Sequence, residues 1–251
     1  MLNYKIYLSD EGYGHIVRQK AILDKLVKYS SNPVNFTLQT QNHLNVAKEI
    51  FGNGKYLNKY NNISWQKKDD GSPDLKKIKI HYENYESKSM DFILKSKNLD
   101  EFDFLVSDFV YEAFQLGISY KIPTFGVAHF TWDWFFSKLY PPSINSKVMN
   151  LFFDFASKAS KIYFPLFTPV EIIRHYGNAV EVPLIVREKK QNPIFSLKTQ
   201  KFNILIIDSG SNLLKLHIEK SIKNLVDLDD IQFFLPDNYN VKSENISYIP
   251  K

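Results

Sequence analysis

The sequence predicts an α/β fold with a Rossmann-like N-terminal domain and an incomplete second Rossmann-like domain. Segments typical of strands alternate with amphipathic helical segments along the chain, which is the pattern of βαβ units and a mainly parallel sheet. The chain is also long enough to bury a full core. It has 251 residues, of which 44% are hydrophobic and 24% are charged, as is usual for globular proteins.

The first βαβ unit starts close to the N-terminus. Its helix is predicted from Ile16, Leu23 and Val27, which share one face with Ile22 and Leu26. The elements expected in this part of the chain are a strand at Tyr4–Leu8, a helix at His15–Tyr29, a strand at Val34–Leu38, a helix at Leu44–Ile50, a third strand at Ile63–Gln66, a polar loop at Lys67–Pro73 and a mostly polar helix at Tyr82–Leu99.

The middle of the chain contains the clearest internal strands. An aromatic-rich stretch follows them and is interrupted by Pro141–Pro142, and because proline ends helices, it predicts two helices with a turn between them. The elements expected here are strands at Phe102–Ser107 and Pro123–Ala128, a helix between them at Tyr111–Tyr120, two helices within Trp132–Ser157 and a strand at Lys161–Phe164.

The domain boundary is expected in a polar stretch around Pro193. We therefore predict a first domain over residues 1–187, a linker over 188–200 and a partial second domain over 201–251. The second domain opens with another βαβ pattern. Its expected elements are a buried strand at Phe202–Ile207, a helix at Leu213–Val226 and short strands at Ile231–Leu235 and Ile246–Ile249.

Composition and charge narrow the class of protein. The net charge of +5 comes mostly from lysines dispersed along the chain, so the sequence does not indicate a nucleic-acid-binding stripe. The absence of cysteine excludes disulfides and thiolate metal sites. No signal peptide is visible and no apolar run approaches membrane-spanning length. We expect a cytoplasmic protein, and peripheral contact with a membrane stays open.

The strongest local signal is the segment Asp10–His15, which lies between an expected strand and an expected helix. Gly12 and Gly14 allow a tight turn and close approach of a ligand to the backbone amides of a helix N-terminus. His15 falls in the first helical turn, where the positive end of the helix dipole favours a neutral imidazole suited to a general base. The alternative is a plain glycine turn with a capping histidine.

A second candidate is Ser107–Asp108, at the carboxyl end of an expected strand. In open α/β sheets ligands bind outside these ends, so Asp108 could face a substrate. The alternative is that Asp108 caps the helix that starts at Tyr111.

A third candidate is the aromatic run from His129 to Phe136, just past another strand end. Trp132 beside His129 and Asp133 suits the face of a sugar, which stacks on aromatic rings while its hydroxyls bind polar groups. The alternative is the packed start of a helix with Asp133 as its cap. The remaining histidines have no partner at ligand spacing, and no metal motif is present.

Together these motifs resemble those of a known superfamily. Gly12–His15 followed by Arg18 is similar to the Gly-x-Gly-His-x-x-Arg loop of glycosyltransferase family 28. The resemblance is closer to the glycosyltransferase-like N-terminal region of L-arabinokinases and its free-standing bacterial relatives, over about residues 1–210. The further matching segments are Val106–Asp108, His129–Asp133, Val182–Arg187 and, more weakly, Asp70–Gly71.

The resemblance implies a GT-B fold and inverting, metal-independent transfer of a sugar from a nucleotide-sugar to an unknown acceptor, without a cofactor. It implies His15 as the general base. The residues expected to bind substrate are Gly12, Gly14, Arg18, Asp70, Asp108, His129, Trp132 and Asp133.

One departure from the family changes the expectation for this chain. Gly210 is the last glycine, whereas family members bind the donor through glycine-rich loops of the second domain. We therefore expect that the chain by itself does not transfer sugar. The alternatives are a non-catalytic sugar- or nucleotide-binding module and the acceptor half of an enzyme completed by a partner chain or a second copy.

Overall fold

The computed structural model describes residues 1–58, 66, 68, 72–139, 146–188, 201–207, 212–225 and 228–249. The chain divides into two compact units. The first comprises residues 1–65 and 76–188, and the second comprises 66–75 and 189–251.

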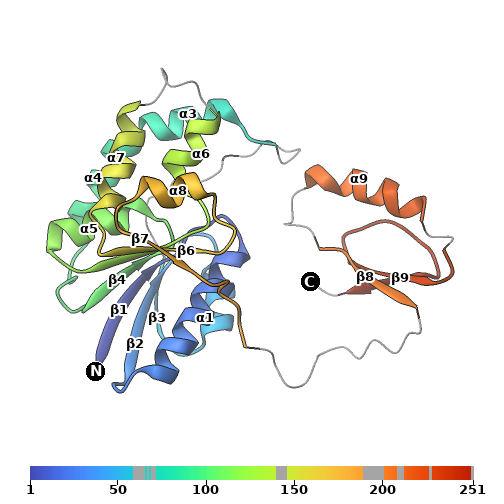
Figure 1. The fold of residues 1–251 in the computed structure, drawn as a ribbon, viewed down its shortest axis with the longest axis horizontal. Coiled ribbons are helices and arrows are strands. Elements are labelled where there is room, and N and C mark those ends of the chain that lie inside the picture. The colour runs from blue at the N-terminus through green and yellow to red at the C-terminus, as the bar shows by residue number, and fades with distance from the viewer. Residues whose placement is uncertain are drawn as a thin grey trace. The chain divides into compact units, whose positions relative to one another are not determined.

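The first unit is built on a seven-stranded sheet in which all neighbouring strands are parallel (Figure 1). The strand order is β3-β2-β1-β4-β5-β6-β7, so the direction of progression reverses between β1 and β4. The strands are β1 (Leu2–Tyr7), β2 (Val34–Gln39), β3 (Lys55–Leu57), β4 (Phe104–Ser107), β5 (Thr124–Val127), β6 (Lys161–Pro165) and β7 (Ala179–Val182).

Helices connect these strands, as expected for a doubly wound α/β sheet. They are α1 (Tyr13–Tyr29), α2 (Leu44–Phe51), α3 (Leu75–Glu83), α4 (Tyr85–Lys95), α5 (Tyr111–Tyr120), α6 (Trp132–Leu139), α7 (Ser146–Ser157) and α8 (Val170–His175). The predicted α/β class and Rossmann-like architecture of this part of the chain are confirmed.

The two faces of the sheet are buried against different helices because strand side chains alternate. Tyr4 and Ile6 of β1 pack with residues of α1 and α2, whereas Tyr7 packs on the opposite face with residues of α4 and α5. A third, aromatic-rich cluster fills the space among α3 to α8 and β6. Its buried members include Tyr82, Phe152 and Phe164.

The helix predicted over Tyr82–Leu99 is wrong in its bounds. Two helices, α3 and α4, occupy this region, and Leu99 lies beyond them in the core. The helices meet at Asn84, whose side-chain amide donates to the carbonyl of Ile80 at 2.8 Å. Such side chain–backbone bonds compete with regular helix geometry. In α1, Val27 is exposed although the helical pattern placed it on the buried face.

The predicted third strand at Ile63–Gln66 lies outside the described residues except for Gln66, which is not in a strand. The strand that follows α2 is the three-residue β3, which is too short to show a period in the sequence. Pro141–Pro142 and Pro193 also lie outside the described residues.

The second unit contains a smaller parallel sheet with the order β10-β9-β8. Its elements are β8 (Phe202–Leu205), α9 (Asn212–Lys223), β9 (Ile231–Pro236) and β10 (Ile246–Ile249). The core of this unit forms around β9, where Phe233 and Leu235 are buried. The prediction of a buried first strand is wrong, because Phe202 and Leu205 of β8 are exposed at the edge of the sheet.

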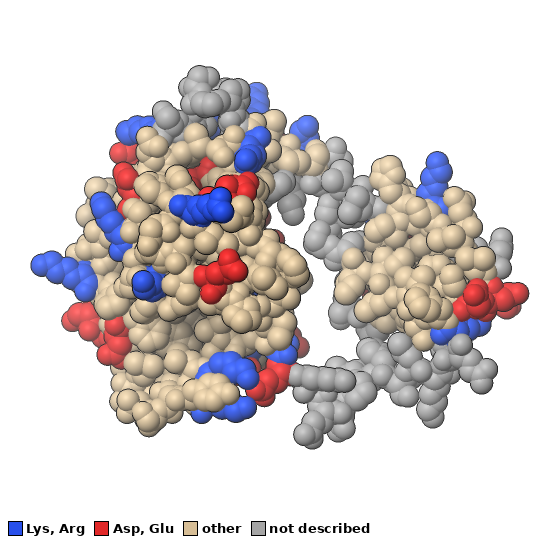
Figure 2. All heavy atoms as spheres, in the orientation of Figure 1, with Lys and Arg blue, Asp and Glu red and all other residues tan. Residues whose placement is uncertain are grey.

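No helix among the described residues is long and apolar enough to cross a membrane. Figure 2 shows acidic and basic side chains interspersed over the visible face of the first unit, without a patch of one sign on that face.

Candidate functional site

A pocket of about 420 Å³ lies at the carboxyl ends of the central strands of the first unit. Its walls come from the segments that follow β1, β4 and β5, together with Ile185. The strand order reverses between β1 and β4, and this point of the sheet is called its switch point (Figure 1). Ligands of open α/β sheets bind in the crevice at the switch point. His15 and Asp108, which the sequence singled out separately, both line it.

His15 is held at this pocket by the turn that starts α1. Gly12 precedes the helix with φ 147° and ψ 170°, a conformation that other residues adopt only under strain. Asp10 fixes the preceding part of the turn, since its carboxylate accepts from Thr40 Oγ1 at 2.7 Å and from the Asn42 amide at 3.0 Å. The first turn of α1 therefore places the half-buried His15 ring beside the end of β4.

Asp108 is completely buried, and its carboxylate accepts three hydrogen bonds from side chains of α1. His15 Nδ1 lies 2.7 Å from Oδ1, and Gln19 Nε2 donates to Oδ2 at 2.9 Å. The guanidinium of Arg18 donates to Oδ1 and forms a buried ion pair with it. The carboxylate thus ties α1 to the end of β4 across a separation of about 90 residues in sequence.

The electrostatics of this cluster keep Asp108 ionised. Burial by itself raises the pKa of the Asp108 carboxyl, but the charge and hydrogen bonds of Arg18 and His15 outweigh it and lower the pKa to about 2. The pKa of His129, which also lines the pocket, is lowered by partial desolvation of its ring and by the nearby charge of Arg18.

The hydrogen-bond network assigns the tautomer of His15. An ionised carboxylate only accepts, so Nδ1 must carry the proton that it donates to Asp108. Arg18 Nη2 lies 3.0 Å from the same nitrogen because both donors converge on one oxygen of Asp108. Nε2 of His15 is then left with its lone pair, which can accept a proton.

Two local features hold Asp108 in place. The Ser107 hydroxyl accepts from the Val110 amide at 2.9 Å and donates to the Val110 carbonyl at 2.8 Å, which closes a turn after β4. Phe109, inside that turn, has φ 48°, which is uncommon for a residue with a bulky side chain. Its buried ring packs edge-on against Tyr111, so aromatic packing offsets the strain.

The structure places Asp108 at the wall of the pocket, but its side chain is buried and its oxygens are engaged by α1. Direct contact between Asp108 and a substrate stays a prediction. Asp108 is not a helix cap, since Val110 occupies the N-cap position of α5 and no side-chain cap bond is formed there.

The third candidate segment is divided between the pocket and the core. His129 is exposed at the pocket, whereas Trp132 is only 2% exposed, stacks on Phe136 and belongs to the aromatic core while one side of it lines the pocket. The indole of Trp132 therefore mainly packs in the core, in agreement with the alternative that this segment is the packed start of a helix.

Asp133 does not line this pocket. It is buried, and its Oδ1 accepts from the hydroxyls of Tyr111 and Tyr176, each at 2.8 Å. It borders a different hollow beside α7 and α8. The structure therefore does not bring Asp133 together with His15, because two tyrosines of the core hold its carboxylate, and its predicted role in substrate binding stays a prediction.

The other predicted residues are distributed as follows. Gly14 lines the pocket with open space around its Cα, and Arg18 lines it while pairing with Asp108. Asp70 lies outside the described residues. Sequence reasoning missed Gln19, whose position one turn after His15 is its only signal. Within the described part of the chain, no group of three or more His, Cys, Asp or Glu side chains could hold a metal ion.

The remaining walls of the pocket are apolar, which defines the kind of molecule it suits. The apolar lining residues are Val17, Phe109, Ala128, Phe130, Trp132 and Ile185. A pocket of this size with an apolar lining and a few convergent polar groups is typical of small-molecule sites.

No known protein-family model and no curated protein match the sequence. Solved structures with a similar fold do exist. CalG4, the calicheamicin glycosyltransferase, is 10% identical with a TM-score of 0.62, over 99% of this chain and 70% of that chain. Arabidopsis thaliana UGT89C1, solved with quercetin, is 10% identical with a TM-score of 0.60, over 99% of this chain and 69% of that chain.

The protein has a GT-B glycosyltransferase-like fold. A UDP-N-acetylglucosamine 2-epimerase is also similar, at 13% identity and a TM-score of 0.51, over 100% of this chain and 68% of that chain. The GT-B fold therefore serves more than one reaction, and function has to be argued from the site. The closer resemblance to the arabinokinase-associated region stays a prediction.

Proposed function

We propose that the protein is a glycosyltransferase-like protein in which the first unit binds and activates the acceptor of an inverting, metal-independent transfer from a nucleotide-sugar. The observation that carries the proposal is the 2.7 Å contact between His15 Nδ1 and Asp108 Oδ1 at the switch point of the sheet. Metal independence comes from the sequence resemblance alone.

In the proposed reaction Nε2 of His15 accepts the proton of an acceptor hydroxyl. The resulting oxygen attacks the anomeric carbon of the sugar, whose bond to the nucleotide phosphate oxygen breaks, and the nucleoside diphosphate leaves with those electrons. Attack from the side opposite the leaving group inverts the anomeric centre. Asp108 acts as a positioning residue, because it fixes the ring and stabilises the imidazolium that forms.

The pocket walls support a largely apolar acceptor that carries a hydroxyl group. Phe109, Phe130 and Ile185 offer apolar surface, while His15 and His129 are two of the polar side chains at the pocket that could reach a hydroxyl. We infer that flat phenolic compounds are suitable probes, and the similar UGT89C1 was solved with one, quercetin.

The test combines acceptor binding with a transfer assay. Calorimetry should detect quercetin binding to the wild-type protein, and released nucleoside diphosphate should be measured with a panel of nucleotide-sugars. Where the chain, alone or with a partner chain, transfers sugar, the change His15→Ala should lower kcat by about 100- to 10,000-fold, the usual range for a lost general base, while quercetin binding persists. His217→Ala, at an exposed histidine of α9, is the matched control.

Each outcome separates the alternatives. An unchanged kcat in His15→Ala would remove His15 from the mechanism. Quercetin binding without transfer by the wild-type chain is the result expected for a binding module, or for an acceptor half that needs a partner chain. A lack of quercetin binding would contradict the proposed acceptor class.

A further inference from the structure

A second hollow, of about 860 Å³, lies in the first unit between α4 and the face of the sheet formed by β1, β2 and β3. It is separate from the pocket of His15 and shares no lining residue with it. Its volume is within the range of small-molecule sites. The residue that distinguishes it is Lys5, in the middle of β1.

Lys5 is a buried cation without a counter-ion of its own. It is 5% exposed, and among the described residues it makes no hydrogen bond and no ion pair. Its ammonium lies 4.8 Å from the centre of the Tyr7 ring and 5.9 Å from that of Phe102, so two aromatic faces partly compensate the charge. Burying a lysine in this way costs free energy unless a partner is supplied.

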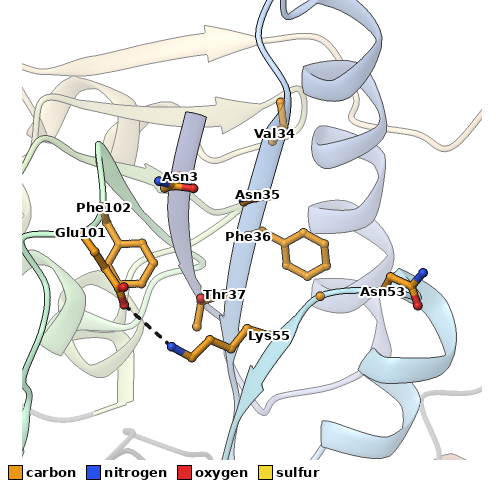
Figure 3. Close-up of a pocket in the computed structure, with 10 residues that line it drawn as sticks. Asn3, Val34, Asn35, Phe36, Thr37, Asn53, Lys55, Glu101 and Phe102 are labelled. Atoms are coloured by element: carbon orange, nitrogen blue, oxygen red, sulfur yellow. Dashed lines mark ion pairs between the residues drawn. The ribbon is translucent and has the colours of Figure 1, made fainter. Parts of the chain in front are cut away.

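Glu101, the carboxylate whose charge acts on Lys5, is already paired with another lysine. Figure 3 shows Lys55 extending from β3 past Thr37 toward Glu101, and their charged atoms are 3.8 Å apart. Glu101 therefore pairs with Lys55. The positive charge of Lys55 in turn disfavours the charged form of Lys5. As a result, burial, followed by the charge of Lys55, lowers the pKa of Lys5 to about 8.

The rim of the hollow is also basic. Lys88 and Lys97 are exposed there and form no ion pair within the described part of the chain, whereas Lys95 pairs with Asp91 at 2.6 Å. The side chains of Gln41 and Asn58, which also line the hollow, can donate hydrogen bonds. The net charge of the side chains around the hollow is positive, and hydrogen-bond donors lie at its base and at its rim.

We propose that this hollow binds a small phosphate-bearing molecule, with Lys5 as the cation at its base and Lys88 and Lys97 at its rim. Lysine ammonium groups bind phosphate as point charges, and phosphate offers enough oxygen atoms to meet several of them at once. The bound anion supplies the direct ion pair that Lys5 lacks among the described residues. The proposal is independent of acceptor activation at His15.

The direct test is calorimetry with inorganic pyrophosphate as the probe. Wild-type protein should bind it, and Lys5→Met should weaken binding by roughly 10- to 100-fold, the value of a hydrogen bond to a charged group. Lys161→Met, at an exposed lysine of β6, should leave the affinity unchanged. Lys97→Met should weaken binding by a smaller factor, because its amine is solvated.

Nuclear magnetic resonance of the lysine side chains provides a second readout that does not depend on a variant. The charged groups that act on the titration of Lys5 are Lys55 and Glu101, its ammonium faces the rings of Tyr7 and Phe102, and the other charged groups that line the hollow are Lys88, Asp91, Lys95 and Lys97. Pyrophosphate should raise the pKa of Lys5, so affinity should fall as pH rises from 7 to 9.

Three results would overturn the proposal. The first is a lack of pyrophosphate binding to the wild-type protein, and the second is equal affinity for wild type and Lys5→Met. The third is binding only to vesicles that contain anionic phospholipid, which would assign the lysines to a membrane surface instead.

Discussion

Among its described residues, the first unit buries two cationic side chains, and their surroundings differ. Arg18 is 9% exposed and is paired with a fully buried carboxylate that also receives His15 and Gln19. Lys5 is 5% exposed, and the described residues give it two aromatic rings but no carboxylate within ion-pair distance, although the charge of Glu101 acts on it from farther away. One charge is neutralised inside the fold, whereas the other is not.

The difference separates two uses of a buried charge. A paired charge can fix geometry: Arg18 and His15 reach the same oxygen of Asp108, which joins α1 to the end of β4. An unpaired charge reduces stability until a ligand compensates it. The pocket of His15 is therefore preorganised for chemistry, and the hollow of Lys5 is suited to binding an anion.

The largest expected effect on stability comes from breaking the ion pair between Arg18 and Asp108. Asp108→Ala should lower the free energy of unfolding by about 3 to 5 kcal/mol, because it leaves the buried Arg18 without its counter-charge. Urea unfolding measures this loss. In an Arg18→Met background, Asp108→Ala should lower the free energy of unfolding by clearly less. An equal loss in the two backgrounds would contradict the pairing of Arg18 with Asp108.

Removing the unpaired cation, Lys5, should change the free energy of unfolding in the opposite direction. Lys5→Met should raise the free energy of unfolding at pH 7 by about 1 to 3 kcal/mol, because it removes a charge that burial disfavours. The folded-state pKa of about 8 lies below the ordinary value of 10.5, so the unfolded state holds more protons between those values. Wild-type stability should therefore rise with pH in this window.

The advantage of Lys5→Met should accordingly shrink when unfolding is measured at pH 10 instead of pH 7. If the variant is less stable than wild type at pH 7, the lysine is favourable in the unliganded fold and the comparison fails. Lys161→Met, which removes a solvated charge, should change stability by less than about 0.5 kcal/mol at either pH.

A smaller effect tests how the turn before α1 positions the histidine. Gly12→Ala should cost about 1 to 3 kcal/mol, because alanine is strained at φ 147°. Gly14 is the matched control: it lies within α1, has no neighbouring atoms that a methyl group would meet, and should become slightly more stable as alanine. Similar effects of both changes on unfolding would show that the turn is not constrained as described.

Much of the first unit was predictable from local sequence, because its longer helices and strands show a hydrophobic period and some of them begin or end at glycine or proline. The helix at Tyr111–Tyr120 agrees with its prediction, and the glycine turn before His15 is where the motif placed it. The role of Asp108 was not predictable, because its partners lie about 90 residues earlier and the alternative of a helix cap was equally consistent with the local pattern.

Burial was the other property that sequence did not determine. Trp132 and Asp133 suit a sugar site by residue type, yet the indole belongs to the aromatic core and the carboxylate binds two core tyrosines. Lys5 does leave a signal in the sequence, because it interrupts the otherwise apolar run Tyr4–Leu8. A charged residue at the centre of a buried strand indicates a partner or a site.

The central claim is that Asp108 holds His15 with its Nε2 ready to accept a proton. Nitrogen-15 correlation spectra of the imidazole ring measure directly which nitrogen carries the proton, in the protein as it is and without a substrate. The account predicts a neutral ring at high pH with the proton on Nδ1, and loss of that preference in Asp108→Asn. A proton on Nε2 in the wild-type protein, or the same tautomer with and without the carboxylate, would contradict it.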